Sequence, residues 1–226
     1  MPIYEHYKEY AKKFFMDLGL PEEKLRFHDH DKLVFYASAA CDIEYKFPFG
    51  FGEINGTHDR TNYDLSQHQE YSGKSMEYLD PETNEKYIPY VVESTVGLDR
   101  TVLAVLCEAY DEETLEDGST REVMRLKPYL APYKVAVLPL VKKFHKEKAE
   151  EIYRMLSKHF MCTYDETGNI GKRYRREDAI GTPFCITIDD ETINNGVVTV
   201  RDRDTMAQIT LNVDEIVDYI NDEIEF

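Results

Sequence analysis

The sequence predicts two modules of different fold class: an α+β module with an antiparallel sheet and helices over residues 1–130, and an α/β module with a mixed sheet over residues 131–226. In the first, turn-rich segments separate apolar strands; in the second, strands alternate with amphipathic helices. Residues 1–130 carry 14 Lys and Arg against 26 Asp and Glu, whereas residues 131–226 carry 13 against 18. Pro128 and Pro132 restrict the backbone near the boundary, which indicates a linker.

Composition excludes several classes of protein. The 226 residues are 42% hydrophobic and carry a net charge of -17, which fits a folded chain and argues against nucleic-acid binding through bulk electrostatics, although a local basic patch stays compatible. The four cysteines lack zinc-site spacing. The N-terminus lacks the apolar core of a signal peptide, and the chain lacks a run of about 18 apolar residues. We therefore expect a cytoplasmic protein with reduced thiols and no membrane span.

The elements of the first module follow from periodicity. Tyr4, Ala11 and Phe15 recur at helical spacing, and Gly19 and Pro21 end that helix. Residues 33–40 and 41–57 are predicted strands, and a polar segment with turn residues follows. The apolar residues of 87–97 predict a buried strand, which leads into a helix over 101–110.

The second module alternates. Strands are predicted over 134–140, 161–166, 183–189 and 196–204, with amphipathic helices over 146–160 and 211–224. A basic segment over 170–181 lies between glycines. The alternating charges of residues 201–204 predict cross-strand ion pairs.

Two acidic residues stand in apolar surroundings. Strand alternation places Glu53 on one face with Phe51 and Asn55, where burying a carboxylate is costly unless a cation meets it. Glu93 interrupts an apolar strand and is followed by Ser94 and Thr95. Two carboxylates and a hydroxyl could hold a small amino group through charge-assisted hydrogen bonds. The alternatives are an exposed edge glutamate for the first and a salt bridge to Arg60 or Arg100 for the second.

A strand, Gly97, Arg100 and a helix follow one another in that order. A helix N-terminus favours anions, and the arginine side chain offers a planar fork for phosphate. Glycine would let a ligand approach the backbone closely. By itself this spacing is a weak signal of a phosphate site.

Two further segments are considered as binding sites, one for a metal ion and one for RNA. The run His28–Asp31 lacks a second ligand group at a convincing spacing, so no metal site is predicted. Residues 171–176 concentrate positive charge and could bind RNA phosphates, with the aromatic ring stacking on an unpaired base. The alternative is a solvated helix start balanced by neighbouring acids. The candidate residues of this basic segment are Lys172, Arg173, Tyr174, Arg175 and Arg176.

Five ordered segments carry a resemblance to a known family. They are GEINGTHDRTNYDLSQH, YVVESTVGLDRTVLAVL, LAPYKVAVLPL, YDETGNIGKRYRREDAIGTPFCITID and VTVRDRDTM. Together they resemble the C-terminal part of the homodimeric type of glycyl-tRNA synthetase, a class II aminoacyl-tRNA synthetase. The resemblance extends over nearly the whole chain.

The resemblance implies the end of a class II catalytic domain over 1–130 and an anticodon-binding domain over 131–226. It implies ATP-dependent activation of glycine, with Mg²⁺ accompanying ATP, and transfer of glycine to tRNA-Gly by a homodimeric parent enzyme. By position, Glu53, Glu93 and Thr95 would bind glycine, although the family usually has serine at the place of Thr95. Gly97 and Arg100 would bind ATP, and the basic segment would bind tRNA. No residue is assigned a catalytic role.

The sequence also departs from the family pattern. The class II motifs that form the dimer interface and carry a further phosphate-binding arginine are not found. We therefore expect a truncated chain that is inactive or weakly active when isolated. The alternative is a non-catalytic, synthetase-like module that binds nucleic acid or protein, as in the accessory subunit of mitochondrial DNA polymerase. The retained Glu53, Glu93 and Arg100 favour the ligase.

Overall fold

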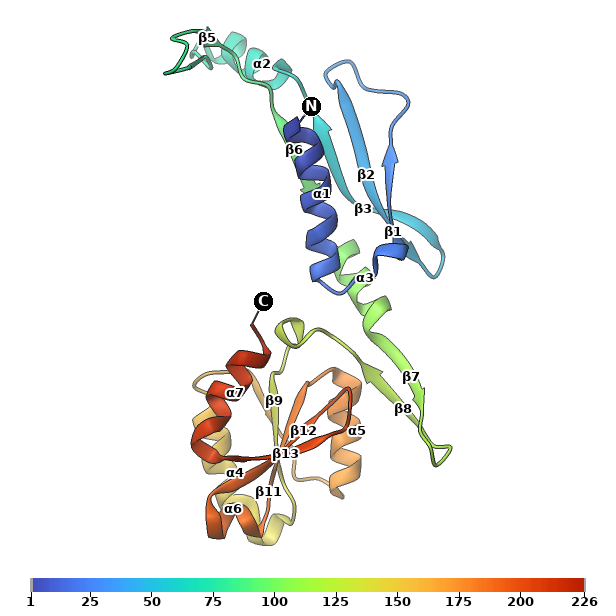
Figure 1. Cartoon of the computed structure of the whole chain (residues 1–226), viewed down its shortest axis with the longest axis vertical. Coiled ribbons are helices and arrows are strands. Elements are labelled where there is room, and N and C mark those ends of the chain that lie inside the picture. Colours follow the sequence, from blue (N-terminus) through green and yellow to red (C-terminus); the bar gives the residue numbers. More distant parts are fainter. Residues whose placement is uncertain (1, 226) are drawn as a thin grey trace. The chain divides into compact units, whose positions relative to one another are not determined.

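The computed structural model describes residues 2–225, which divide along the chain into two compact units between Cys107 and Glu108 (Figure 1). Each unit has its own sheet and its own hydrophobic core. None of the helices within residues 2–225 is both long and apolar enough to span a membrane.

An antiparallel sheet forms the centre of the first unit, which confirms the sequence prediction; it has four strands, of which β1 was not predicted. The strand order is β1-β2-β3-β6. The bounds are β1 (Leu25–Asp29), β2 (Ala39–Phe47), β3 (Gly50–Asp59) and β6 (Val92–Val96). The strand predicted within 87–97 is present as β6, but among residues 2–225 it pairs only with β3 and lies mostly exposed, so the prediction that it is buried is wrong.

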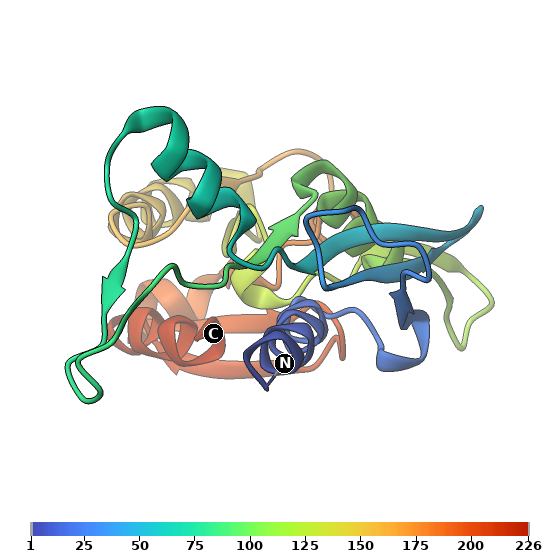
Figure 2. The same cartoon turned by 90° about the horizontal axis from the view of Figure 1, so that it is seen from above.

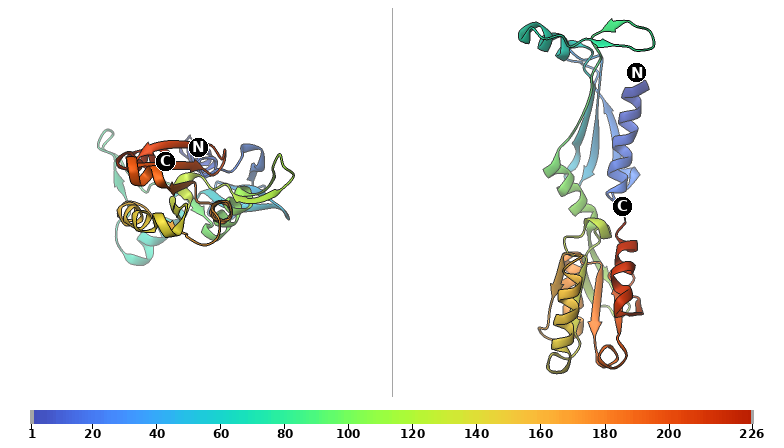
Figure 3. Two further views of the ribbon diagram at one scale, coloured as in Figure 1. Left: turned by 90° about the horizontal axis from the view of Figure 1, so that it is seen from below. Right: turned by 90° about the vertical axis from the view of Figure 1, so that its left-hand side faces the viewer.

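Helix α1 (Pro2–Asp17) covers one face of this sheet (Figure 3, right). The short helix η1 (Glu22–Lys24) leads into β1, and α3 (Leu98–Ala109) follows β6. Apolar residues of α1, the sheet and α3 form one core, which comprises Ala11, Phe15, Leu20, Leu25, Ile43, Tyr45, Phe47, Ile54 and Ala104. The opposite face of the sheet carries polar side chains and provides the candidate site.

Two segments of this unit differ from the prediction. Residues 33–38 form an exposed turn rather than a strand, because Leu33, Val34 and Phe35 find no core to enter. The polar stretch after β3 contains helix α2 (Tyr63–Ser72; Figure 2). Its sequence has no apolar stripe, so none of its residues is buried. It is followed by the small hairpin of β4 (Tyr78–Leu79) and β5 (Lys86–Tyr87).

The second unit contains a five-stranded mixed sheet with the order β10-β9-β11-β12-β13. Strand β9 pairs in parallel with both β10 and β11, and the pairs of β12 with β11 and β13 are antiparallel. This confirms the predicted α/β module. The bounds are β9 (Val135–Pro139), β10 (Cys162–Tyr164), β11 (Phe184–Ile188), β12 (Val197–Asp202) and β13 (Gln208–Asn212), the last of which was not predicted.

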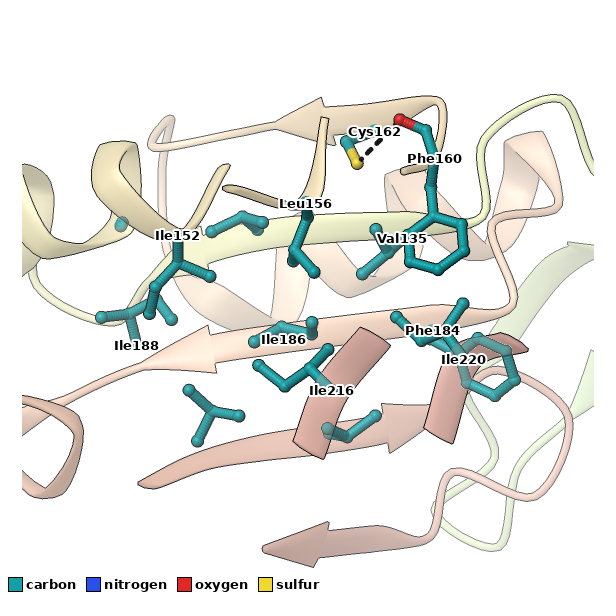
Figure 4. Close-up of a cluster of buried hydrophobic side chains, with 14 residues drawn as sticks. Val135, Ile152, Leu156, Phe160, Cys162, Phe184, Ile186, Ile188, Ile216 and Ile220 are labelled. Carbon is teal, nitrogen blue, oxygen red and sulfur yellow. Dashed lines mark hydrogen bonds between the residues drawn. The ribbon is translucent and has the colours of Figure 1, made fainter. Parts of the chain in front are cut away.

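The two faces of the mixed sheet pack against different helices. Helices α4 (Lys142–Leu156) and α7 (Ile216–Glu223) contribute Ile152, Leu156, Ile216 and Ile220 to the larger core (Figure 4). Helix α5 (Ile170–Ile180) packs on the opposite face, against Ala136, Leu138 and Cys185. Alternate residues of β9 and β11 thus face different helices. The short helices are α6 (Asp190–Asn195), η2 (Pro128–Leu130) and η3 (Val213–Glu215).

A hairpin of β7 (Tyr110–Thr114) and β8 (Thr120–Met124) belongs to the second unit. Its Arg121 is 2% exposed, pairs with Asp178 of α5 and donates to the carbonyl oxygens of Arg203 and Asp204. These contacts explain why the compact division falls at residue 107 rather than at the predicted boundary of 130. The boundary of the evolutionary domain at 130 stays a prediction.

Candidate functional site

An irregularity in β3 decides where Glu53 points. The register pairs Glu44 with Glu53 and Ile43 with Asn55, so Ile54 is an extra residue that forms a bulge. Directly paired residues point to the same face of a sheet. Asn55 therefore shares the face of buried Ile43, whereas Glu53 shares the open face with Glu44. The prediction that Glu53 and Asn55 lie on one face is wrong, because simple alternation ignores the bulge.

An open pocket of about 490 Å³ lies where β3 and β6 meet the start of α3. Four of the residues predicted to bind glycine or ATP line this pocket, namely Glu53, Thr95, Gly97 and Arg100. Glu93 precedes Thr95 by two residues on β6, so its side chain lies on the same open face. The fold thus gathers residues that are 47 positions apart.

Arg100 contacts Glu53 across the pocket. One terminal nitrogen of its guanidinium donates to the backbone oxygen of Glu53 at 2.9 Å and lies 3.5 Å from its carboxylate. Both side chains are more than half exposed. Arginine carries five N–H donors, so most of this guanidinium is free to meet an anion.

Glu93 forms the salt bridge to Arg60 that the sequence left open as an alternative. Nη1 of Arg60 lies 2.8 Å from Oε2 of Glu93. The other two nitrogens of Arg60 bond to Asp64, and its guanidinium stacks on the ring of Tyr36. Arg60 lowers the pKa of Asp64, chiefly through this hydrogen bond. Asp64 was not identified from the sequence, although its i,i+4 spacing from Arg60 was a usable signal.

The neighbouring hydroxyls of β6 point to opposite faces. Thr95 pairs with Gly56 on the open face and lines the pocket. Ser94 instead bonds to Asn55 and Thr57 on the other face. The hydroxyl that stands at the place of the family's serine is therefore the one next to the pocket.

Gly97 is not required by the packing of the chain itself. A Cβ atom built there would meet its nearest neighbours, Arg100 and Ile54, at 3.7–3.8 Å, which is ordinary van der Waals contact. Gly97 also lies just before the first turn of α3, where backbone N–H groups lack helical partners. Any need for glycine here would come from a ligand.

The basic segment lies on α5, and its side chains divide into buried and exposed ones. Arg173 is 3% exposed and donates to the backbone oxygens of Pro139 and Gly168. The hydroxyl of Tyr174 bonds to Thr187 at 2.6 Å, and Arg201 stacks on its ring. Both side chains have internal partners, which differs from the exposed geometry we expected for RNA contacts.

Three cations of the same helix remain at or near the surface. Lys172 is exposed, Arg175 is partly buried and Arg176 pairs with Asp165. Their spacing of three and four residues places them on one side of α5. Of the five candidate RNA-binding residues, these three are therefore the ones that an RNA could reach most easily.

The charges of residues 201–204 do not form cross-strand pairs. Arg201 is 5% exposed and binds Asp178 through two nitrogens, at 2.8 and 3.1 Å. Arg203 is buried and donates to the backbone oxygens of Gly181 and Leu126. The sequence prediction is wrong here because it treated a buried strand as a solvated one.

His28 of β1 and His30, just after that strand, are paired with acids of β2. His28 lies 3.4 Å from Glu44, and His30 lies 2.8 Å from Asp42. Within residues 2–225, no group of three or more His, Cys, Asp or Glu side chains is placed to hold a metal ion. All four cysteines are free thiols.

Comparison with known proteins found similarity along nearly the whole chain. A family model described as an anticodon binding domain matches residues 134–223. The chain is 56% identical over 225 residues to the glycine–tRNA ligase of Clostridium tetani (strain Massachusetts / E88). The aligned region covers 99% of this chain and 48% of that protein. It is 55% identical to the glycine–tRNA ligase of Geobacillus thermodenitrificans (strain NG80-2), also over 225 residues.

Nearly the whole chain is therefore similar to one part of glycine–tRNA ligases. It spans about half the length of the curated relatives it matches. The resemblance seen in the five sequence segments is thus confirmed, and the matched anticodon binding domain lies within the second unit. The roles of individual residues are not tested by these matches and stay predictions.

Proposed function

We propose that this chain provides the glycine- and ATP-binding surface of a glycine–tRNA ligase, which activates glycine with ATP and transfers it to tRNA-Gly. The observation that carries the proposal is the pocket at the start of α3, which gathers Glu53, Thr95, Gly97 and Arg100 beside Glu93. The relatives are named glycine–tRNA ligases, and this chain matches about half the length of each, which supports the same reaction.

The two glutamates would bind the ammonium group of glycine. Glycine has no side chain to grip, so selection depends on its charged ends and on the exclusion of larger amino acids. Arg60 contacts only Oε2 of Glu93, which leaves Oε1 as an acceptor for an N–H donor. Arg60 would thereby fix the orientation of the carboxylate.

Arg100 would bind a phosphate of ATP together with the N–H groups at the start of α3. Adenylate formation requires alignment and stabilisation of charge on the phosphates rather than covalent help from the protein. Mg²⁺ would enter as part of the substrate, bound to ATP. It would neutralise the phosphate charge, while the chain's own residues hold the two reactants.

The second unit would bind tRNA through its anticodon binding domain. We assign phosphate contacts to Lys172, Arg175 and Arg176, and a supporting role to Arg173 and Tyr174, which hold the segment in place. The parent ligase would act as a homodimer in the cytoplasm, where reduced thiols such as those of this chain's four cysteines persist.

Glycine-dependent ATP–pyrophosphate exchange tests the proposal. Glu93→Gln should lower exchange by about tenfold or more, since it removes a charge-assisted contact. Gly97→Ala should lower exchange while leaving stability intact. Glu70→Gln, which alters an exposed acid of α2, is the matched control.

Glycine binding provides a second measurement if pyrophosphate exchange by the chain alone is too slow to compare variants. Glycine titrated into the ¹⁵N-labelled chain should perturb the amides of Thr95 and Gly97, and Glu93→Gln should abolish this response. A chain that binds RNA but neither exchanges pyrophosphate nor responds to glycine would instead be a non-catalytic binding module.

A further inference from the structure

A second pocket lies in the second unit, between the hairpin and α5, which pack side by side (Figure 1). It has a volume of about 230 Å³ and is lined by Thr120, Arg121, Glu122, Arg175 and Ala179. Helix and strand thus each contribute a hydrogen-bonding side chain. The hairpin lies outside residues 134–223, which match the anticodon binding domain.

Arg175 has an unusual hydrogen-bonding state. Its Nη1 atom is buried and bonds to no atom of residues 2–225. A buried N–H group of a charged side chain without an acceptor is costly, so it calls for a partner. The hairpin acid Asp117 lies near enough for Arg175 to contribute to the lowering of its pKa, after the larger effect of hydrogen bonds from Ser119, but the two form no ion pair within 4 Å.

The other side chains that line the pocket differ from Arg175 in their hydrogen-bond partners or their charge. Arg121 is committed to Glu113, Asp178 and two backbone oxygens, so its charge is balanced. Thr120 is exposed at the rim and has a hydroxyl that can donate. Glu122 is also exposed and would oppose an anion.

We propose that this pocket binds a phosphate-class oxyanion, held by the guanidinium of Arg175 and the hydroxyl of Thr120. Lys172 and Arg176 lie on the same side of α5 as Arg175. A phosphodiester of RNA that crosses this side would reach the pocket; a free phosphate ion offers the same chemistry. Only the RNA source rests on the proposed function, because phosphate binding is independent of glycine activation.

The test is a titration of inorganic phosphate into the full ¹⁵N-labelled chain at constant ionic strength. Saturable changes are expected in the amides of Thr120, Glu122 and Ala179. Arg175→Gln should weaken affinity about tenfold, the loss expected for one charged hydrogen bond. Glu122→Gln should strengthen affinity, whereas Arg154→Gln, which removes an exposed arginine from α4, should leave it unchanged.

Opposite signs for Arg175→Gln and Glu122→Gln separate a specific site from general charge effects. Equal losses in Arg175→Gln and Arg154→Gln, or a response that does not saturate, would overturn the proposal. An RNA hairpin added as competitor distinguishes the sources. Displacement of phosphate identifies an RNA phosphodiester as the ligand; binding of RNA without displacement identifies a free phosphate ion.

Discussion

The cations of residues 172–176 carry the same formal charge but differ in burial, and burial separates structural from ligand-directed roles. Arg173 is 3% exposed, and its donors are directed to backbone oxygens that end β9 and precede α5. Arg176 is about half exposed and pairs with Asp165. A loss of RNA binding on mutation therefore has different meanings at the two positions.

Arg173→Gln should destabilise the second unit by about 2–4 kcal/mol, because it leaves buried carbonyl groups without donors. Arg176→Gln should change stability by no more than about 1 kcal/mol, as is typical of an exposed ion pair. Urea unfolding followed by circular dichroism measures both. Equal effects of the two substitutions would contradict the assignment of Arg173 as a structural residue.

Glu177 provides a prediction about pH. It is 4% exposed, and desolvation raises its pKa above the usual value of 4.5, although a hydrogen bond from Thr182 acts in the opposite direction. The folded chain therefore binds this proton more tightly than the unfolded chain. The resulting stability is present below the unfolded pKa and is lost as pH rises through the folded pKa.

Glu177→Gln removes this titration while keeping a neutral acceptor for Thr182. The variant should have a higher melting temperature than the parent chain at about pH 8, and the difference should disappear at about pH 4, where the parent carboxyl is protonated. Glu116→Gln, in the exposed loop of the hairpin, serves as the control. Thermal unfolding at the two pH values decides; a difference that persists at low pH would point to packing instead of ionisation.

At the scale of elements, the hairpin β7–β8 is attached to the mixed-sheet unit by buried charges. Asp178 has no exposed side-chain surface and receives hydrogen bonds from both Arg121 and Arg201. Paired buried charges are strongly destabilising when one partner is removed. The hairpin's attachment should therefore depend on Arg121 more than on its partly exposed neighbour Arg125.

Arg121→Met should cost about 2–4 kcal/mol, below the full penalty of an unpaired buried charge because Asp178 retains Arg201. Amides of β7 and β8 should lose protection against hydrogen exchange, whereas those of β9 and β11 should not. Arg125→Gln, whose side chain is 30% exposed, should have a smaller effect. Unchanged protection in β8 after Arg121→Met would show that other contacts hold the hairpin.

The same elements show what sequence patterns can and cannot predict. Helix α1 and the strands β9 and β11 follow directly from apolar periodicity, because each buries one side or both. Helix α2 was missed because nothing in it is buried, and the bulge at Ile54 reversed the face of Asn55. The site residues around Gly97 were found by motif, but the partners Asp64 and Arg201 depend on contacts between distant elements.

At the scale of the whole molecule, the second unit holds together through contacts that begin before the predicted boundary at residue 130. The second has a large apolar core and a network of buried charges that includes the hairpin. Cutting the chain at the sequence boundary of 130 would remove Arg121 and Leu126, both of which contact Arg203 or its backbone. The compact division at residue 108 keeps these contacts.

We therefore expect residues 108–226 to fold independently and to melt several degrees above residues 131–226. In the shorter piece, Arg203 would lose its acceptor on Leu126, and Asp178 would lose one of its two arginines. Differential scanning calorimetry of both pieces measures the difference. Arg121→Met in the longer piece removes the ion pairs and backbone hydrogen bonds of this one side chain and keeps Leu126. A melting temperature between those of the two pieces would then attribute part of the gain to Arg121. Identical melting temperatures of both pieces would instead show that the independently folding domain begins near residue 130, where the prolines lie.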